Sequence, residues 1–396
     1  MRISLDEALA RTLQCGAERR VSPVAVSVDA AVGRVLCEDV AFPTSLPPFS
    51  YAQMDGYALS CAASVAERFA VVGESRAGSP SEGVQPGAAV AISTGAMMPL
   101  GMTAVVPWEH VERVGDAITL LRSVRAGQFI RNLGEDASAG DLVARSGQRL
   151  GLVHVAAIAV AERAEIRVAR APTVALFVTG DELRAPGSGG ASGSIVDTNS
   201  PMLVAMLRRA GADLTFVKPV PDVDGALEKA LADCATDIVI TIGGAADGEH
   251  DHVARAFARL EAEWLFRGVA IKPGKPVGMA RRGSQILVAL PGNPGSAYVT
   301  AALFILPLLR AMEGDTNAAP RFVRALTATS LSASEDRANL HYGGLSLVEG
   351  RVIFEPARSV ASGSVAGLLG ARCLALVPAQ KPVQAGGLVD VLVVDP

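Results

Sequence analysis

The chain has 396 residues, enough for two or three domains at about 150 residues each, and half of them are hydrophobic. A net charge of −4 without a basic stripe argues against nucleic acid as the main partner. No uninterrupted apolar run would cross a bilayer, and the N-terminus lacks the apolar core of a signal peptide, so we expect no membrane partner and a cytoplasmic location. Five scattered cysteines without a CxxC pair favour free thiols over a disulfide framework or a zinc cluster.

The N-terminal part of the chain predicts a helix followed by a β-rich region. Residues 4–18 carry leucines every four residues, and Ser4 suits the N-cap. Short apolar runs separated by Gly, Pro and Ser then predict a β-rich insertion over residues 49–139. An apolar stretch at 152–160 predicts a further helix, and a strand is expected at 165–170.

From Pro172 onward, apolar strands alternate with helices. The clearest strands are TVALFV at 173–178, DIVITI at 237–242 and QILVAL at 285–290. This alternation predicts a doubly wound, mostly parallel α/β domain. After Gly314 the runs are strand-like again and predict a small β-barrel or sandwich. The chain is therefore expected to be a multidomain protein of the α/β plus β class.

Three loops of this α/β region follow apolar strands directly: TGDE at 179–182, GGAA at 243–246 (the glycine loop) and PGNP at 291–294 (the PGNP loop). Ligands bind open α/β sheets outside the carboxyl ends of the strands. Glycine N–H groups beside a helix N-terminus can hold an anion there. Turn formation alone explains any one loop, but three loops at one sheet edge favour a ligand site.

Charged residues form two further sets. Lys272 and Lys275, held by prolines, form a stiff turn (the KPGK turn) that suits a phosphate or another oxyanion, unless it is only a solvated basic loop. The acids are Asp55, Asp136 and Asp251. Acids beside a polyanion are unfavourable unless a divalent cation or a transferred proton offsets the repulsion. If the two sets meet, they predict a metal-assisted phosphate site; otherwise the acids are turns and helix caps.

Other catalytic patterns are weak or absent. The sequence His250-Asp251-His252 could ligate zinc, but it stands at a helix start without a third ligand nearby, so helix capping is favoured. The GxGxxG and GxxxxGK[ST] motifs are absent, which weakens a dinucleotide enzyme or an ordinary NTPase.

Taken together, the motifs resemble those of the molybdopterin molybdenumtransferase family (MoeA and the E domain of gephyrin). LPPFSYAQMDGYAL is similar to the family's LPPFDNSAMDGYA block, and ISTGAMMPLGMTAVVPWE to its TGAPxPxGADAVV block. FIRNLGEDASAGD, TGDEL, SIVDTNSPML, the glycine loop, IKPGKP and LPGNPGSA follow in the family's order. The resemblance runs from about residue 4 to residue 390.

The resemblance implies the last step of molybdenum cofactor synthesis, in which molybdate is inserted into adenylyl-molybdopterin and AMP is released with the help of Mg²⁺. It also implies an elongated homodimer, with the cleft between the α/β domain of one subunit and the β insertion of the other. Molybdopterin adenylyltransferase and molybdoenzymes are the protein partners that it suggests. The implied parts are a discontinuous linker and dimer domain (1–48 and 140–171), a β-rich insertion (49–139), an α/β molybdopterin-binding domain (172–318) and a C-terminal barrel (319–396).

The resemblance further implies roles for individual residues. Molybdate is a dianion whose capture needs hydroxyl, N–H and cationic donors, and its oxo groups leave as water, which needs protons. The implied catalytic residues are Asp55, Asp136, Asp251, Lys272 and Lys275, and the implied metal ligands are Asp55, Glu182 and Asp251. The implied substrate-binding residues are Thr94, Arg131, Thr179, Glu182, Gly243, Gly244, Gly248, Pro291, Asn293, Pro294 and Ser362.

Two departures from the family's motifs leave alternatives open. The Asn-Ser pair of NSAMDGYA is replaced at Tyr51 and Ala52, and a serine of the glycine loop is replaced by Ala246, with Asp247 added. Both changes remove polar donors, so one alternative is a divergent paralogue that binds the pterin or a partner without turnover. Tungstate in place of molybdate is a second alternative. A related adenylyltransferase is a third, although it would resemble the α/β domain only.

Overall fold

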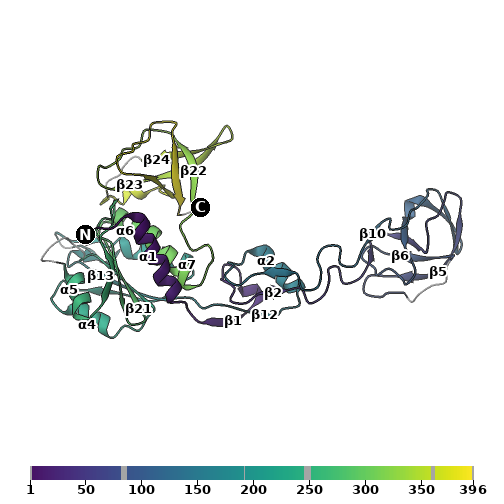
Figure 1. Cartoon of the computed structure of the whole chain (residues 1–396), viewed down its shortest axis with the longest axis horizontal. Helices are drawn as coiled ribbons and strands as arrows, with labels where there is room; N and C mark the ends of the chain where they lie inside the picture. Colours follow the sequence, from purple (N-terminus) through teal and green to yellow (C-terminus); the bar gives the residue numbers. More distant parts are fainter. Residues whose placement is uncertain (1, 82–86, 191, 245–250, 358–361, 395–396) are drawn as a thin grey trace.

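The structure is a computed structural model that describes residues 2–81, 87–190, 192–244, 251–357 and 362–394. The molecule is elongated (Figure 1). An α/β domain and a C-terminal barrel form one end, a small middle module follows, and a β module stands at the far end of a thin two-segment connection.

The α/β domain is built on a six-stranded sheet in the order β16-β13-β17-β21-β20-β18. The first four strands are parallel, and β20 runs antiparallel to both of its neighbours, β21 and β18, which confirms the predicted mostly parallel sheet. The central strands are buried along their whole length, as expected for strands covered on both faces. The bounds are β13 Thr173–Thr179, β16 Asp213–Val220, β17 Ile238–Ile242, β18 Glu263–Arg267, β20 Gly278–Arg282 and β21 Gln285–Leu290.

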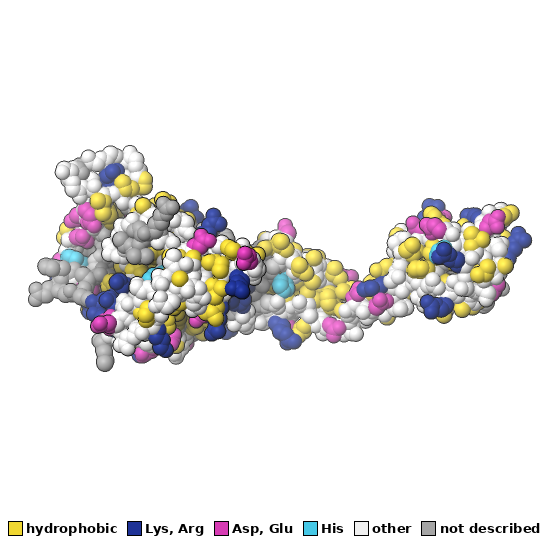
Figure 2. All heavy atoms as spheres, turned by 90° about the horizontal axis from the view of Figure 1, so that it is seen from above, with side chains coloured by type: hydrophobic (Ala, Val, Ile, Leu, Met, Phe, Trp, Pro, Cys, Tyr) yellow, Lys and Arg dark blue, Asp and Glu magenta, His cyan; other side chains and the backbone are white. Residues whose placement is uncertain are grey.

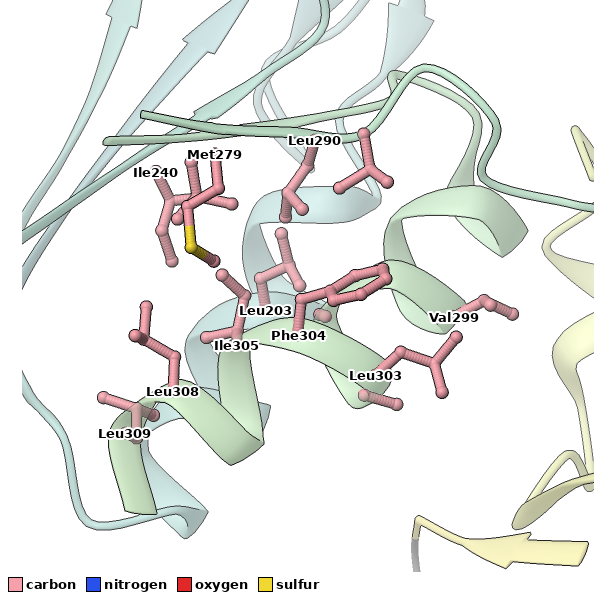
Figure 3. Close-up of a cluster of buried hydrophobic side chains, with 14 of the residues drawn as sticks. Leu203, Ile240, Met279, Leu290, Val299, Leu303, Phe304, Ile305, Leu308 and Leu309 are labelled. Carbon is pink, nitrogen blue, oxygen red and sulfur yellow. The ribbon is translucent and has the colours of Figure 1, made fainter. Parts of the chain in front are cut away.

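Helices cover both faces of this sheet. One face packs against α3 (Asn199–Arg209) and the continuous helix formed by α6 (Pro294–Thr300), a π-helical turn (Ala301–Ile305) and α7 (Leu306–Met312), as Figure 3 shows. The other face packs against α4 (Ala226–Ala232) and α5 (His252–Arg259). The segment Pro294–Met312 is long and apolar enough to span a membrane, but 89% of its most apolar window is buried, as in the core helix of a globular domain.

The N-terminal helix α1 (Leu5–Glu18) begins at the predicted N-cap, where Ser4 accepts a hydrogen bond from the Glu7 amide. The helix lies along α7 of the α/β domain, away from the middle module. The two backbones approach so closely that a Cβ placed on Gly16 would lie 2.6 Å from the Cβ of Ala311. Residues near the start of the chain therefore belong to the hydrophobic core of the α/β domain.

The middle module consists of antiparallel strand pairs and one helix. Strand β1 (Pro23–Ser27) pairs with β12 (Glu165–Ala169), and β2 (Val40–Ala41) pairs with β11 (Leu142–Ala144). Helix α2 (Leu152–Val160) occupies the predicted position. Its first two residues, Leu152 and Val153, are 78% and 80% exposed although both are apolar.

The β module holds a six-stranded sheet in the order β7-β4-β6-β5-β9-β8 and a short pair, β3 with β10. The β-rich prediction for this region is confirmed. The bounds are β3 Tyr51–Ala52, β4 Gly56–Leu59, β5 Arg68–Ser75, β6 Ala88–Ile92, β7 Ala104–Pro107, β8 Val111–Val114, β9 Ala117–Leu120 and β10 Ile130–Arg131.

The C-terminal strands form a closed barrel, because β23 pairs with both β24 and β25. The structure thus selects the barrel over the sandwich. Strand β19 (Ile271–Lys272), which comes from the α/β domain, pairs with β23 and joins the two domains. The barrel strands are β22 Phe322–Thr327, β23 Ala338–Val348, β24 Arg351–Pro356, β25 Cys373–Val377 and β26 Leu388–Val393.

Candidate functional site

The three predicted loops meet at one edge of the α/β sheet. Thr179, at the end of β13, donates its hydroxyl to the carbonyl oxygen of Ile242 at 3.3 Å. A Cβ placed on Gly243 would lie 2.7 Å from the Thr179 carbonyl oxygen, and one placed on Gly292 would lie 3.5 Å from the Cα of Gly243. The absence of side chains at these glycines lets the loops approach one another and leaves their backbone at the edge of the sheet.

Two polar residues that sequence reasoning did not single out complete this edge. Asn199 donates its side-chain amide to the Gly292 carbonyl oxygen at 2.6 Å. The Oδ1 atom of Asn199 and the Oγ atom of Ser200 are buried, and they have no hydrogen-bond partner among the described residues. Buried polar atoms without partners are unfavourable, so they suit the polar groups of a ligand. Both residues lie in the SIVDTNSPML segment, and the resemblance of that segment to the family's motif is the sequence feature that could have pointed to them.

The 179–182 loop contributes acids on the side toward β16. The carboxylate of Glu182 turns back over Gly180, where an added Cβ would lie 3.0 Å from both of its oxygens. Asp181 accepts a hydrogen bond from the Asp222 amide at 3.1 Å. Burial, together with the negative charge of Asp181, raises the pKa of Asp222. The carboxylates of Asp181, Glu182 and Asp222 therefore lie close together on this side of the edge.

Asp251 is already engaged on both of its carboxylate oxygens. Oδ1 accepts from the Ala254 amide at 2.8 Å and caps α5, and Oδ2 accepts from Arg267 at 2.7 Å. The prediction that the His250-Asp251-His252 sequence caps a helix is confirmed for Asp251. The predicted residue Gly248, as well as Ala246 and His250, lies outside the described residues.

The KPGK turn is held between the barrel and α6. Lys272 lies in β19 opposite Asn339 of β23, and its side chain is exposed, whereas Lys275 is half-buried. A Cβ placed on Gly274 would lie 2.5 Å from the Cγ2 atom of Thr300, so the turn sits tightly on the helix. The two lysines therefore place positive charge on this side of the site.

The PGNP loop contacts the barrel through Ser362. Asn293 donates its amide to the Ser362 hydroxyl at 3.5 Å, and the Gly295 amide donates to the Ser362 carbonyl oxygen at 2.9 Å. Pro291 is buried at the end of β21, and Pro294 opens α6. The structure thus brings Ser362 to the loops of the α/β domain.

The remaining predicted residues lie together in the β module. Asp55 accepts a hydrogen bond from the Thr94 amide at 2.7 Å. Arg131, which pairs with Tyr51 across β3 and β10, forms ion pairs with Glu135, at 3.1 Å, and with Asp136. The β module stands at the opposite end of the chain from the KPGK turn (Figure 1). One chain therefore does not bring Asp55, Thr94, Arg131 and Asp136 to the sheet-edge site.

The carboxylates predicted to bind Mg²⁺ do not form a metal site within one chain. The β module, which carries Asp55, stands apart from the α/β domain, which carries Glu182 and Asp251 (Figure 1), and each carboxylate oxygen of Asp251 already accepts a hydrogen bond. The described part of the chain has no group of three His, Cys, Asp or Glu side chains placed to hold a metal ion. The residues present therefore do not fit a resident metal ion in this arrangement.

Comparison with known proteins gives consistent matches along the chain. Three family descriptions match: "MoeA N-terminal region (domain I and II)" at residues 3–161, "Probable molybdopterin binding domain" at 175–311 and "MoeA C-terminal region (domain IV)" at 324–394. The molybdopterin molybdenumtransferase of Nostoc sp. is 33% identical over 384 residues, covering 93% of this chain and 87% of the relative. That of Staphylococcus epidermidis is 29% identical and covers 99% and 96%. A solved molybdopterin biosynthesis MoeA protein from Pyrococcus horikoshii has a TM-score of 0.82 at 28% identity, covering 99% and 100%.

Proposed function

Because this chain belongs to the molybdopterin molybdenumtransferase family, we propose that it inserts molybdenum into molybdopterin during molybdenum cofactor biosynthesis. The observation that carries the proposal is the sheet edge where Thr179, Gly243 and Gly292 meet, with the KPGK turn and Ser362 beside it. This edge offers backbone groups, hydroxyls and cations to an anionic, polar ligand.

We further propose that the pterin substrate is adenylyl-molybdopterin and that the second substrate is molybdate. The unpartnered Asn199 and Ser200 atoms suit polar groups of the pterin nucleotide. Lys272 and Lys275, together with the Ser362 hydroxyl, supply the cationic and hydroxyl donors that a tetrahedral dianion needs. Tungstate has the same shape and charge, so these donors would accept it as well.

The chemistry requires protons as well as anion binding. Molybdate oxo groups leave as water when the dithiolene sulfurs bind molybdenum, each taking up two protons from the thiols or from nearby acids, and hydrolysis of the pyrophosphate bond releases AMP. Asp55 and Asp136 are the exposed carboxylates that we propose as proton donors or acceptors. Since both oxygens of Asp251 are engaged, we propose a structural role for it instead. A divalent cation would have to be held by substrate phosphates or across two chains.

We propose that the active cleft forms between two copies of the chain. The β module of one copy would bring Asp55, Thr94 and Arg131 to the sheet edge of the other. The exposed apolar residues at the start of α2 suit the dimer contact, because such patches on a surface mark interaction sites. Figure 2 shows hydrophobic side chains gathered over this middle module. On this proposal the predicted linker and dimer domain makes its contact through α2.

A binding protein without turnover is the second candidate, and its motive is the loss of polar residues at Ala52 and Ala246. Ala52, however, is fully buried, and its amide donates to the Ala96 carbonyl oxygen at 3.0 Å. A serine hydroxyl at position 52 would therefore point into the core of the β module rather than toward a ligand. This observation favours the enzyme over the binding protein.

The test is to incubate the protein with adenylyl-molybdopterin, molybdate and Mg²⁺ and to follow AMP release and molybdenum incorporation. We expect both products, and we expect Lys275→Ala to abolish them while the fold is retained. Chelation of the divalent cation is expected to stop the reaction. Folded protein that binds the pterin without releasing AMP would instead identify the binding protein. We place the reaction in the cytoplasm, where a molybdopterin adenylyltransferase would supply the substrate and molybdoenzymes would receive the product.

A further inference from the structure

An ion pair between Arg267 and Asp251 joins two parts of the sheet-edge site. Arg267 is the last residue of β18, and its guanidinium donates to Asp251 Oδ2 at 2.7 Å. The Asp251 side chain is 8% exposed and the Arg267 side chain 49%. The other oxygen, Oδ1, caps α5 through the Ala254 amide. The carboxylate is thus held on one side by its own helix and on the other by a neighbouring strand.

The backbone that follows Arg267 holds the KPGK turn. The Gly268 amide donates to the Val277 carbonyl oxygen at 2.9 Å, and the Val269 amide donates to the Lys275 carbonyl oxygen at 3.0 Å. Arg267 itself lies opposite Gly278 in the β18–β20 pair. Movement of Arg267 would therefore be transmitted to the backbone of the turn that carries Lys275.

Aromatic contacts hold the Arg267 guanidinium between β18 and α5. The Cζ atom of Arg267 lies 5.8 Å from the ring centre of Trp264, within the range of a cation–π interaction. The Trp264 ring in turn packs 5.2 Å from the ring of Phe257, a fully buried residue of α5. Strand β18 is therefore connected to the N-cap of α5 by a charge contact and to the later part of the same helix by a ring contact.

We propose that Arg267 is a positioning residue for the anion site: it sets the distance between the start of α5 and the KPGK turn. It acts through Asp251 and through the backbone at Val269. Asp251 on this account is the anchor of that contact and supplies no metal ligand. The inference rests on the function proposed above, in which the KPGK turn binds molybdate.

The kinetic test compares Arg267→Ala, Arg267→Lys and Asp251→Asn in the full-length protein. Asparagine remains a good helix cap but loses the charge attraction, so Asp251→Asn should reproduce Arg267→Ala. We expect each to raise the KM for molybdate about two- to fivefold, as for the loss of one half-exposed charged contact, with kcat changed less than about twofold. Arg267→Lys should recover part of the loss. The double variant should be no worse than either single variant, because the two residues share one interaction.

Arg281→Ala is the matched control, since Arg281 of β20 forms a 2.7 Å ion pair with Glu263 on the same sheet but does not precede the KPGK turn. It should leave the KM for molybdate unchanged. Additive effects of Arg267→Ala and Asp251→Asn, or an equal KM increase in Arg281→Ala, would overturn the proposal.

Hydrogen–deuterium exchange separates this proposal from the proposed function, because it needs no turnover. Arg267→Ala should accelerate exchange both at the start of α5 and at the Val269 amide, whether or not the wild type inserts molybdenum. Acceleration confined to α5, or at neither place, would overturn the positioning role. A wild type without molybdenum insertion, together with the expected exchange, would instead refute the function and leave the structural link in place.

Discussion

Gly56 lies beside Asp55, where the backbone of a neighbouring strand approaches it closely. It belongs to β4 and pairs with Ile92 of β6 on one side and with Pro107 of β7 on the other. A Cβ placed on Gly56 would lie 2.8 Å from the carbonyl carbon of Val106, and closer still to its oxygen. These are backbone atoms of β7, the strand at the edge of the sheet, so the contact can be relieved only by moving the strand and not by rotating a flexible side chain.

We therefore predict that Gly56→Ala displaces β7. Moving the Val106 carbonyl carbon from 2.8 Å to an ordinary distance of about 3.5 Å requires a shift of about 0.7 Å, and its oxygen, which is closer still, requires a larger shift. Overpacking of this kind costs about 1–3 kcal/mol of stability. The displacement also reaches the site, because the amide of Trp108, the next residue after β7, donates to the Asp55 carbonyl oxygen at 3.3 Å. A misplacement near 1 Å can lower turnover about 100-fold.

The assay is hydrogen–deuterium exchange of the amides in β6 and β7, together with AMP release. Gly73→Ala is the matched control, because Gly73 lies exposed in β5 of the same module and its added Cβ would meet only the Ser81 Oγ atom, at 3.6 Å. The control should change stability by less than about 0.5 kcal/mol. Unchanged exchange at Val106 and Trp108 in Gly56→Ala, or equal effects of the two substitutions, would refute the reasoning.

Three further predictions concern pH, thiol reactivity and assembly. Burial raises the pKa of Asp237, but hydrogen bonds from Arg170 and a threonine outweigh it, and the net shift is downward. The resulting stability is present above the ordinary pKa of 3.8 and is lost as the pH falls through the lower pKa of the folded state. Asp237→Asn should therefore make the stability measured by urea unfolding depend less on pH in the acid range. An unchanged pH dependence contradicts this. Burial raises the pKa of Cys373 to about 11. At pH 8, iodoacetamide should therefore label exposed Cys61 first and Cys373 only after unfolding. Rapid labelling of Cys373 in the native protein, detected by mass spectrometry, would contradict its packing. Val153→Asp, at an 80% exposed position, should shift sedimentation from dimer to monomer without lowering the melting temperature of the monomer; a retained dimer contradicts the α2 contact.

The strands of the α/β domain could be predicted closely because each is a continuous apolar run ended by a turn. The predicted strand at 285–290 agrees with β21 at both ends, and those at 173–178 and 237–242 each differ from β13 and β17 by one residue at one end. The three loops at the sheet edge were also predictable, since parallel strands bring their carboxyl ends to one edge. Chain order and residue type were sufficient for these features.

Features that depend on packing between distant segments could not be predicted. The position of α1 against α7 is fixed by the small residues Gly16 and Ala311, which carry no recognisable pattern in the sequence. The engagement of Asp251 depends on Arg267, 16 residues away, and an acid in a motif looks the same whether it is free or paired. The separation of the β module from the sheet edge follows from the long connection and not from any local motif.

The central claim is that each active cleft combines the β module of one chain with the α/β domain of another. The most direct measurement mixes two inactive variants, Asp55→Asn and Lys275→Ala, after dissociation and reassembly. Random pairing makes about half of the dimers mixed, and each mixed dimer has one of its two clefts intact, so activity should return to roughly a quarter of the wild-type value. A mixture of Asp55→Asn with Thr94→Ala, both in the β module, should recover nothing. No recovery from the first mixture, although sedimentation shows mixed dimers, would contradict the shared cleft.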